Sequence, residues 1–248
     1  MIRNLTLEIC CYSIQSVINA AAAKADRVEL CADITSGGIT PSSGLIESAV
    51  QVGIDVYVII RLRGGDFFYS ADEFKIMELD IISCKNIGVK GVVIGLLNKD
   101  GSVDKVRTKR LVELAYPMDV TFHRAIDMSN DLFKAMDDIY ECGIKRILTS
   151  GGYNTALEGI EVIKQMVAYS ENRLSVMAGS GVNANNIKQF YDVGVREFHS
   201  SATSYIQSQM EYRNPKLNMG NKADFDEYAM QVADFEKIKE MKLVLEKL

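Results

Sequence analysis

The chain has 248 residues, of which 48% are hydrophobic and 25% are charged, and its formal net charge is -5 at pH 7. This balance is ordinary for a globular protein and shows no basic cluster, so we exclude nucleic acid and membrane surfaces as partners. No run reaches the roughly 18 consecutive apolar residues of a membrane span, and no signal-peptide pattern opens the chain. The five cysteines form no disulfide framework, which favours a reducing compartment, and we expect a cytoplasmic protein.

Short β-rich runs alternate along the chain with longer stretches of helical spacing. Eight such runs are present, at residues 5–10, 27–31, 55–61, 91–95, 119–124, 145–150, 174–179 and 195–200. Strands that alternate with helices pair in parallel, and eight such units in about 250 residues predict a closed (β/α)8 TIM-type barrel. An open doubly wound sheet is the alternative.

The chain contains three prolines and no linker-like or low-complexity tract, so we expect a single domain over residues 1–248. After the last predicted strand, the polar stretch from about 203 to 221 is interpreted as a long loop. A final helix is expected from about Ala223. Loops of that length are uncommon unless they serve binding or assembly.

Side-chain alternation predicts which strand residues face the barrel axis. In the first strand the apolar residues Leu7 and Ile9 face the helices, which turns Glu8 and Cys10 inward. The same argument turns inward Glu29, Cys31, Arg61, His123 and His199. Because active sites of such barrels lie at the carboxyl ends of the strands, these side chains are the first candidates for a functional site.

A soft-metal site is the first chemistry that this set of residues suggests. Cys10 and Cys31 lie on neighbouring strands, and barrel closure brings the strand of His199 to the other side of the first strand. Two thiolates, with an imidazole as a third candidate ligand, favour Cu(I) over hard cations. The competing interpretation is a pair of buried thiols that only fill space.

An anion pocket is the second kind of site that these residues suggest. Glycine- and serine-rich loops follow the last three strands, where barrels gather backbone amides around phosphate groups. Tight turns alone would also explain such loops. The residues expected to hold an anion are Arg63, Arg124, Gly151, Gly152, Gly179, Ser180, Gly181, Ser200 and Ser201.

Acid–base catalysis is the third chemistry that these residues suggest. Glu8 or Glu29 could serve as a general base, with Arg61 and His123 as electrophilic partners, in a lyase or isomerase type of reaction. Inward carboxylates and arginines also neutralise one another inside barrels, so ion pairing is the alternative.

Several motifs together resemble the CutC family of copper homeostasis proteins, from the first strand to about Ala202. They are "LEICCYSIQSVINA", "ADRVELCAD", "GGITPSSGLI", "RGGDFFYSADEF", "VTFHRAID", "LTSGG" and "REFHSSA". The resemblance implies a cytoplasmic TIM-type barrel, commonly a homo-oligomer, with a role in copper tolerance and trafficking. It also implies a Cu(I) site on the cysteines that end the first two strands, which are Cys10 and Cys31 here.

We therefore predict a CutC-like barrel for copper homeostasis that binds Cu(I) through these two cysteines. The alternative is a barrel enzyme that acts on a small anionic or phosphorylated compound. Whether the chain catalyses any reaction is left open by its sequence.

Overall fold

The eight predicted strands close into one parallel barrel in the computed structural model, which describes residues 5–214, 216 and 226–248. The strands are β1 (Thr6–Cys11), β2 (Arg27–Leu30), β3 (Asp55–Ile59), β4 (Gly91–Ile94), β5 (Asp119–Phe122), β6 (Arg146–Thr149), β7 (Ser175–Ala178) and β8 (Glu197–Ser200). Pairing between β8 and β1 completes the ring. The predicted barrel is confirmed, and the open sheet is excluded.

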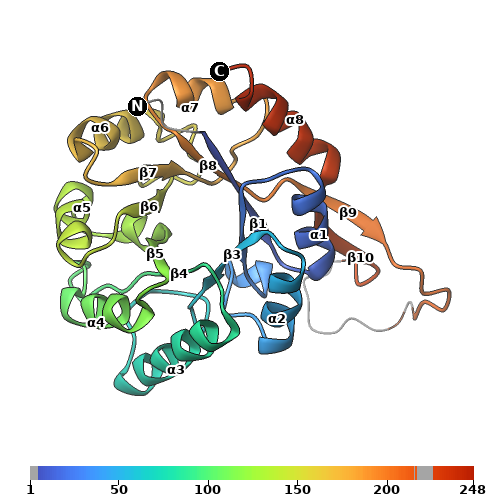
Figure 1. The fold of residues 1–248 in the computed structure, drawn as a ribbon, viewed down its shortest axis with the longest axis horizontal. Coiled ribbons are helices and arrows are strands. Elements are labelled where there is room, and N and C mark those ends of the chain that lie inside the picture. The colour runs from blue at the N-terminus through green and yellow to red at the C-terminus, as the bar shows by residue number, and fades with distance from the viewer. Residues whose placement is uncertain (1–4, 215, 217–225) are drawn as a thin grey trace.

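Helices surround the strands as an outer ring, as Figure 1 shows. They are α1 (Ile14–Ala22), α2 (Ser43–Gln51), α3 (Ala71–Ile87), α4 (Lys105–Ala115), α5 (Leu132–Glu141), α6 (Ile160–Ser170), α7 (Ile187–Asp192) and α8 (Phe235–Leu245), with short 3-10 turns at Ile34–Ser36 and Arg124–Met128. In the described part of the chain, no helix is both long enough and apolar enough to cross a bilayer.

Strand side chains separate into an outer and an inner layer, as alternation predicts. Leu7, Ile9 and Cys11 belong to the large core between the strands and the helices. Cys10, Cys31 and Ile59 form a separate, smaller cluster. The β1 side chains of even number therefore face the barrel axis, which places the candidate ligands inside the ring of strands.

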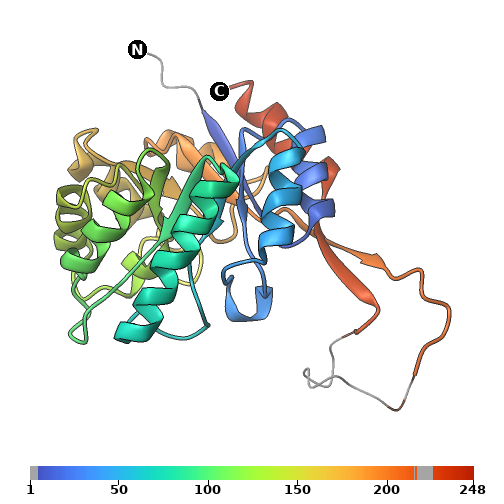
Figure 2. The ribbon, with the colours of Figure 1, turned by 60° about the horizontal axis from the view of Figure 1, so that its bottom comes forward.

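The region after β8 differs from the predicted loop. Thr203–Gln207 forms strand β9, which pairs antiparallel with β10 (Ala229–Ala233) and projects away from the barrel as a two-stranded ribbon (Figures 1 and 2). The last helix begins at Phe235, not near Ala223, because the Asp234 side chain caps it by accepting the Lys237 N–H. Residues 215 and 217–225, including the predicted helix start, lie outside the described part of the chain.

Candidate functional site at the mouth of the barrel

A cavity of about 480 Å³ opens at the carboxyl ends of the strands. Its lining residues come from β1, β2, β3, β6 and β8 and from the segments that follow β1, β2, β3, β5, β7 and β8. Those with titratable or sulfur-bearing side chains are Cys10, Tyr12, Glu29, Arg61, His123, Arg124, Asp127, Met128 and His199. The location is where catalytic and binding residues gather in barrels of this type.

Two cysteines and a histidine lie close together at one side of the cavity, where Cys10 and His199 line the wall and Cys31 lies behind Cys10. The Sγ atoms of Cys10 and Cys31 are 3.7 Å apart, although these residues are not register partners, since Cys10 is paired with Glu29. The stagger of barrel strands brings the two sulfur atoms together from different levels. Cys10, Glu29 and His199 offer ligand atoms that all lie within 4.8 Å of one another.

The charges in this cluster are strongly perturbed by their surroundings. The hydrogen bond from the Cys31 thiol lowers the pKa of Cys10 well below its ordinary value, and His199 adds to this effect, although burial opposes it. The same hydrogen bond and burial raise the pKa of Cys31. Burial lowers the pKa of His199, but hydrogen bonds with Cys10 and Glu8 outweigh it and raise the pKa overall. These shifts favour the thiolate form of Cys10, the thiol form of Cys31 and the imidazolium form of His199.

Glu8 lies beneath this cluster and is fully engaged by its neighbours. Its carboxylate accepts a hydrogen bond from Arg27 Nε at 2.5 Å and contacts His199 Nδ1 at 2.8 Å. Burial alone would raise the pKa of Glu8, but the charge of Arg27, with help from His199, lowers it to about 2. Glu8 does not line the cavity. It orients His199 and is a poor general base.

Glu29 has the opposite character. Burial, followed by the negative charge of Cys10, raises the pKa of Glu29 well above its ordinary value. Its carboxyl lies 3.6 Å from His199 Nε2 and lines the cavity. The raised pKa favours the protonated carboxyl, so Glu29 suits a general acid better than the general base that the sequence predicts.

Arg61 and His123, which the sequence nominates as electrophilic partners, line the opposite side of the cavity. The Arg61 guanidinium donates to the carbonyl oxygens of Ser36, Gly38 and Gly65 and lies over the Phe67 ring. Burial, reinforced by the charge of Arg61, lowers the pKa of His123 to about 3. His123 therefore stays neutral under physiological conditions.

The other two predicted arginines behave differently from each other. Arg63 does not line the cavity, because its guanidinium turns to Glu73 and Asp66. Arg124 lines the cavity but is paired with Asp127, at 2.9 Å from Nε to Oδ2. Neither arginine is free to hold an anion without a rearrangement of these pairs.

The glycine-rich loop after β6 already holds a carboxylate of the protein itself. Asp127 accepts the N–H groups of Ser150 and Gly152, and the Gly151 N–H goes to the Thr149 hydroxyl. These amides are the donors that the sequence assigns to a phosphate. The structure therefore does not bring Gly151 and Gly152 to the cavity as an anion cradle.

The loops after β7 and β8 reach the cavity with most of their predicted residues. Ser180, Gly181, Ser200 and Ser201 line it, whereas Gly179 does not. The Ser180 hydroxyl donates to Asn154 O and the Ser200 hydroxyl to Val182 O, so both are engaged within the protein. The loops after β7 and β8 therefore form one wall of the cavity, but the Ser180 and Ser200 hydroxyl protons are bonded to backbone oxygens.

Sequence reasoning missed several residues that matter here. Arg27 neutralises Glu8, and Asp127 fills the loop after β6; neither was predicted as part of the site. Tyr12 lines the cavity next to Cys10, whose charge adds to burial in raising the pKa of the tyrosine. A usable signal existed for Tyr12, because it continues the even-numbered alternation of Glu8 and Cys10 by one step.

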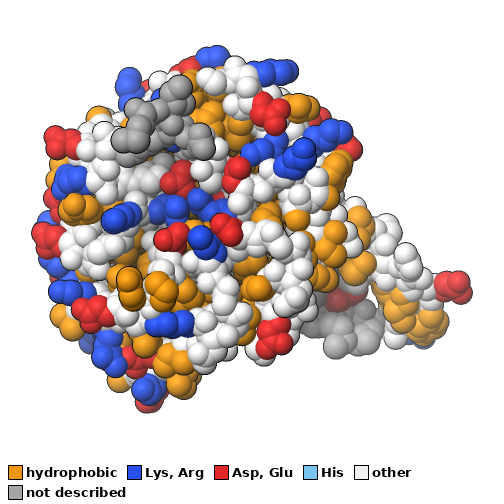
Figure 3. Space-filling view, in the orientation of Figure 1, with side chains coloured by type: hydrophobic (Ala, Val, Ile, Leu, Met, Phe, Trp, Pro, Cys, Tyr) orange, Lys and Arg blue, Asp and Glu red, His pale blue; other side chains and the backbone are white. Residues whose placement is uncertain are grey.

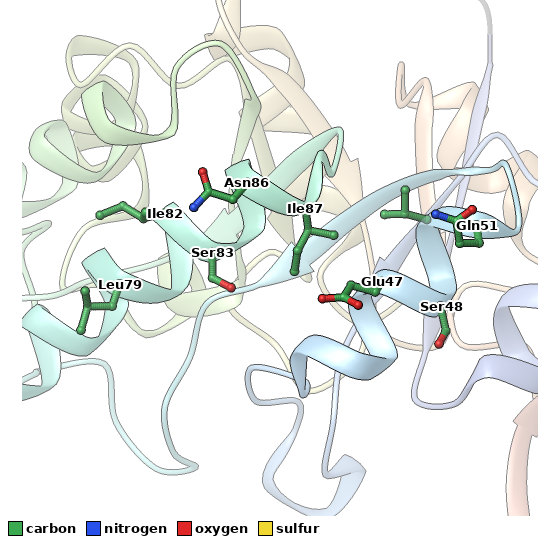
Figure 4. Close-up of a pocket in the computed structure, with 9 residues that line it drawn as sticks. Glu47, Ser48, Gln51, Leu79, Ile82, Ser83, Asn86 and Ile87 are labelled. Carbon is green, nitrogen blue, oxygen red and sulfur yellow. The ribbon is translucent and has the colours of Figure 1, made fainter.

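A second, larger hollow of about 900 Å³ lies on the outer surface between α2 and α3 (Figure 4). Glu47 is the one charged residue that lines it, beside amide, hydroxyl and aliphatic side chains. The hollow thus lacks the set of groups that catalysis or metal binding needs. Figure 3 shows acidic and basic side chains intermixed on the face seen there, with no field of one sign.

Comparisons with known proteins agree with this fold and extend over most of the chain. The family model described as "CutC family" matches residues 5–204. A CutC family protein from Enterobacter sp. is 46% identical over 97% of this chain and 98% of its own length, and one from Erwinia tasmaniensis is 42% identical over 96% and 95%. The crystal structure of CutC from Streptococcus agalactiae, described as a proposed copper homeostasis protein, is 33% identical with a TM-score of 0.76, covering 79% of this chain and 98% of its own. The chain belongs to the CutC family.

Proposed function

We propose that this protein is a cytoplasmic copper homeostasis protein that binds Cu(I) through Cys10 and Cys31. The observation that carries the proposal is the 3.7 Å separation of the two sulfur atoms, and the lowered pKa of Cys10 favours its thiolate form. Thiolates are the ligands that soft Cu(I) prefers. All five cysteines are free, which agrees with a reducing compartment.

The distance between the sulfur atoms fits a bent two-sulfur site. Two metal–sulfur bonds of about 2.3 Å that meet near the tetrahedral angle span roughly 3.8 Å. The observed 3.7 Å needs almost no adjustment for such an arrangement. A linear arrangement would require about 4.6 Å between the sulfur atoms and hence a movement of one side chain.

The surrounding residues would control the protons that metal binding displaces. Uptake of Cu(I) by both cysteines releases the proton that lies between the two sulfur atoms, because the metal binds thiolates. His199 can become a third ligand through Nε2 once it loses a proton, because Glu8 holds Nδ1.

Anaerobic Cu(I) titration against a competing chelator tests the proposal. We expect Cys10→Ser and Cys31→Ser each to weaken binding by at least about 100-fold, since loss of a first ligand costs more than the 10–100-fold of an outer partner. Cys84→Ser is the matched control, because Cys84 is a buried thiol on α3 outside the cavity. Equal affinity in all three variants would reject the proposal.

A second candidate function is favoured by the size of the cavity. About 480 Å³ far exceeds the volume of a bare ion and falls in the range of roughly 300–1,000 Å³ typical of small-molecule sites. With Glu29 as acid and Cys10 and His199 beside it, the site could serve a lyase or isomerase acting on a small anionic compound.

Turnover of a metabolite extract, followed by mass spectrometry, tests this second function. The native protein should consume at least one compound, and Glu29→Gln should slow its consumption by about 100-fold or more, the lower range for loss of an acid–base group. The enzyme hypothesis fails if the native protein consumes no compound, or if Glu29→Gln consumes the same compounds at the same rate.

A further inference from the structure

Arg61 is a buried cation without an anionic partner. Its exposed fraction is 6%, yet no carboxylate of the described residues forms an ion pair with it. Arg124, the other arginine that lines the cavity, is paired with Asp127. A buried charge is strongly unfavourable unless an opposite charge balances it.

The guanidinium is held rigidly by the loops after β2 and β3. Nη1 donates to Ser36 O at 2.6 Å and to Gly38 O at 2.9 Å, and Nη2 donates to Gly65 O at 3.0 Å. These bonds use three of the five N–H groups of an arginine and leave Nε–H and one Nη2–H. Nε has no partner at normal hydrogen-bond geometry among the described residues, although the Tyr69 hydroxyl, which is also unpartnered, lies near the guanidinium. Carbonyl oxygens orient the cation but leave its net charge in place.

His123 supplies a second hydrogen-bond donor beside this cation. Its Nδ1 accepts the Ala125 N–H at 3.1 Å, so the proton of the neutral ring resides on Nε2. Nε2 has no partner in the described structure, and the side chain is 4% exposed. The ring packs against Phe67 with 4.9 Å between centroids, and Arg61 covers the same Phe67 ring.

We infer that Arg61 and His123 form a subsite for the oxyanion of a small organic molecule, either a carboxylate or a phosphate ester. The inference rests on the second candidate function and deepens it by assigning the two residues that hold the anionic group of the substrate, and it does not depend on copper binding. The oxyanion balances the charge of Arg61 and accepts the His123 Nε2–H. The rest of the molecule then occupies the cavity that Cys10, Glu29 and His199 also line.

This subsite differs from the one that the sequence predicts. It uses Arg61 and His123 at the ends of β3 and β5, whereas the sequence assigns the anion to Arg63 and Arg124, which follow the same two strands, and to glycines and serines of the loops after β6, β7 and β8. The alternative is a purely structural role, in which Arg61 joins two loops through their carbonyl oxygens. That role would leave the charge of Arg61 uncompensated. It predicts that anions do not shift the NMR signal of His123. That difference makes the inference testable.

Histidine-specific 15N NMR provides the test, because the chain has only two histidines. The probes are inorganic phosphate and sodium acetate, added separately to the metal-free protein at constant pH and ionic strength. We expect at least one probe to shift the His123 Nε2–H resonance saturably, and the more effective probe identifies the oxyanion. Arg61→Gln should weaken that probe at least tenfold. Arg63→Gln is the matched control and should bind as the native protein does.

Several outcomes would overturn the inference. The first is a His123 signal of the native protein that neither anion shifts at concentrations up to ~0.1 M. The second is a shift of the His199 signal alone. The third is an affinity of Arg61→Gln for the anion that equals the affinity of the native protein. If circular dichroism shows that Arg61→Gln is unfolded, Arg61→Lys replaces it, because lysine keeps the charge but loses the Nε–Nη2 edge. Repeating the titration with Cys10→Ser separates this subsite from the copper proposal, since that variant should still bind the anion.

Discussion

Glu8 shows how one residue can be predicted in place but not in role. Strand alternation correctly turns it toward the barrel axis, together with Cys10. The sequence could not show that Arg27, its register partner on β2, and His199, its register partner on β8, would both bond to its carboxylate. Pairing across strands depends on the register of the closed ring, which no local pattern encodes. The predicted base is therefore a positioning residue.

The low pKa of Glu8 makes stability dependent on pH in a defined direction. Its folded pKa, about 2, lies below the ordinary value of 4.5, so the unfolded chain takes up the proton first as pH falls. Stability from this group is present above pH 4.5 and is lost toward pH 2, by at most about 3 kcal/mol. We expect Glu8→Gln to flatten this part of the curve in urea unfolding between pH 5 and 3.

The control for that experiment is Glu113→Gln, at an exposed position on α4. It should leave the pH dependence as it is in the native protein. A native curve and a Glu8→Gln curve that fall in parallel would contradict the ion-pair network assigned to Glu8.

Individual elements were predicted best where a local signal decides their ends. Ser70 and Glu73 form a capping box that starts α3, and this Ser-x-x-Glu spacing can be read directly from the sequence. The stretch Thr203–Gln207 was wrongly assigned to a loop, because its β-strand depends on pairing with Ala229–Ala233 more than twenty residues later. Distant pairing of this kind leaves little trace in a short window of sequence.

The turn after β4 depends on a glycine that makes room for the site. A Cβ at Gly95 would lie 2.3 Å from His123 Cε1 and 2.8 Å from the Ala125 Cβ. We expect Gly95→Ala to displace the His123 ring and to lower the free energy of unfolding by about 1–3 kcal/mol, the usual cost of overpacking. Urea unfolding measures the loss, and His123 NMR reports the displacement.

Gly44→Ala serves as the comparison, because nothing lies within 4 Å of the Cβ that it would add on α2. That change should be neutral or stabilising by up to about 1 kcal/mol, since alanine favours helices more than glycine does. Equal stability of the two variants would mean that the close contact at Gly95 is not a constraint.

At the scale of the whole molecule, eight repeated units predicted the closed barrel and the convergence of Cys10, Cys31, Glu29 and His199. What the sequence could not give is how the loops meet across the mouth. Asp127 fills the amides of the loop after β6, and Arg63 turns away to Glu73. In both cases a charged side chain bonds to a residue of another part of the barrel mouth instead of remaining free for a ligand. Which partner it takes depends on distances in the folded protein.

Homo-oligomer formation stays a prediction. We expect the β9–β10 ribbon to form the contact between subunits. Ile206 and Met230 are cross-strand partners with exposed fractions of 41% and 50%. Two-stranded ribbons are marginal alone and gain stability from packing on another surface. Sedimentation should give a mass of at least two 27.5 kDa chains, and the double change Ile206→Lys and Met230→Lys should reduce it.

Val106→Lys is the control for that measurement, because Val106 is an 83% exposed apolar residue on α4. It should leave the mass unchanged. A native protein that sediments as one chain at every concentration would contradict the prediction.

The copper proposal is tested most directly by X-ray absorption spectroscopy of the protein loaded anaerobically with one equivalent of Cu(I). We expect two sulfur neighbours at about 2.3 Å, and one fewer in each of Cys10→Ser and Cys31→Ser. A copper shell made of nitrogen and oxygen neighbours alone, or a sulfur shell that both variants leave intact, would contradict the assignment of these two cysteines as the metal site.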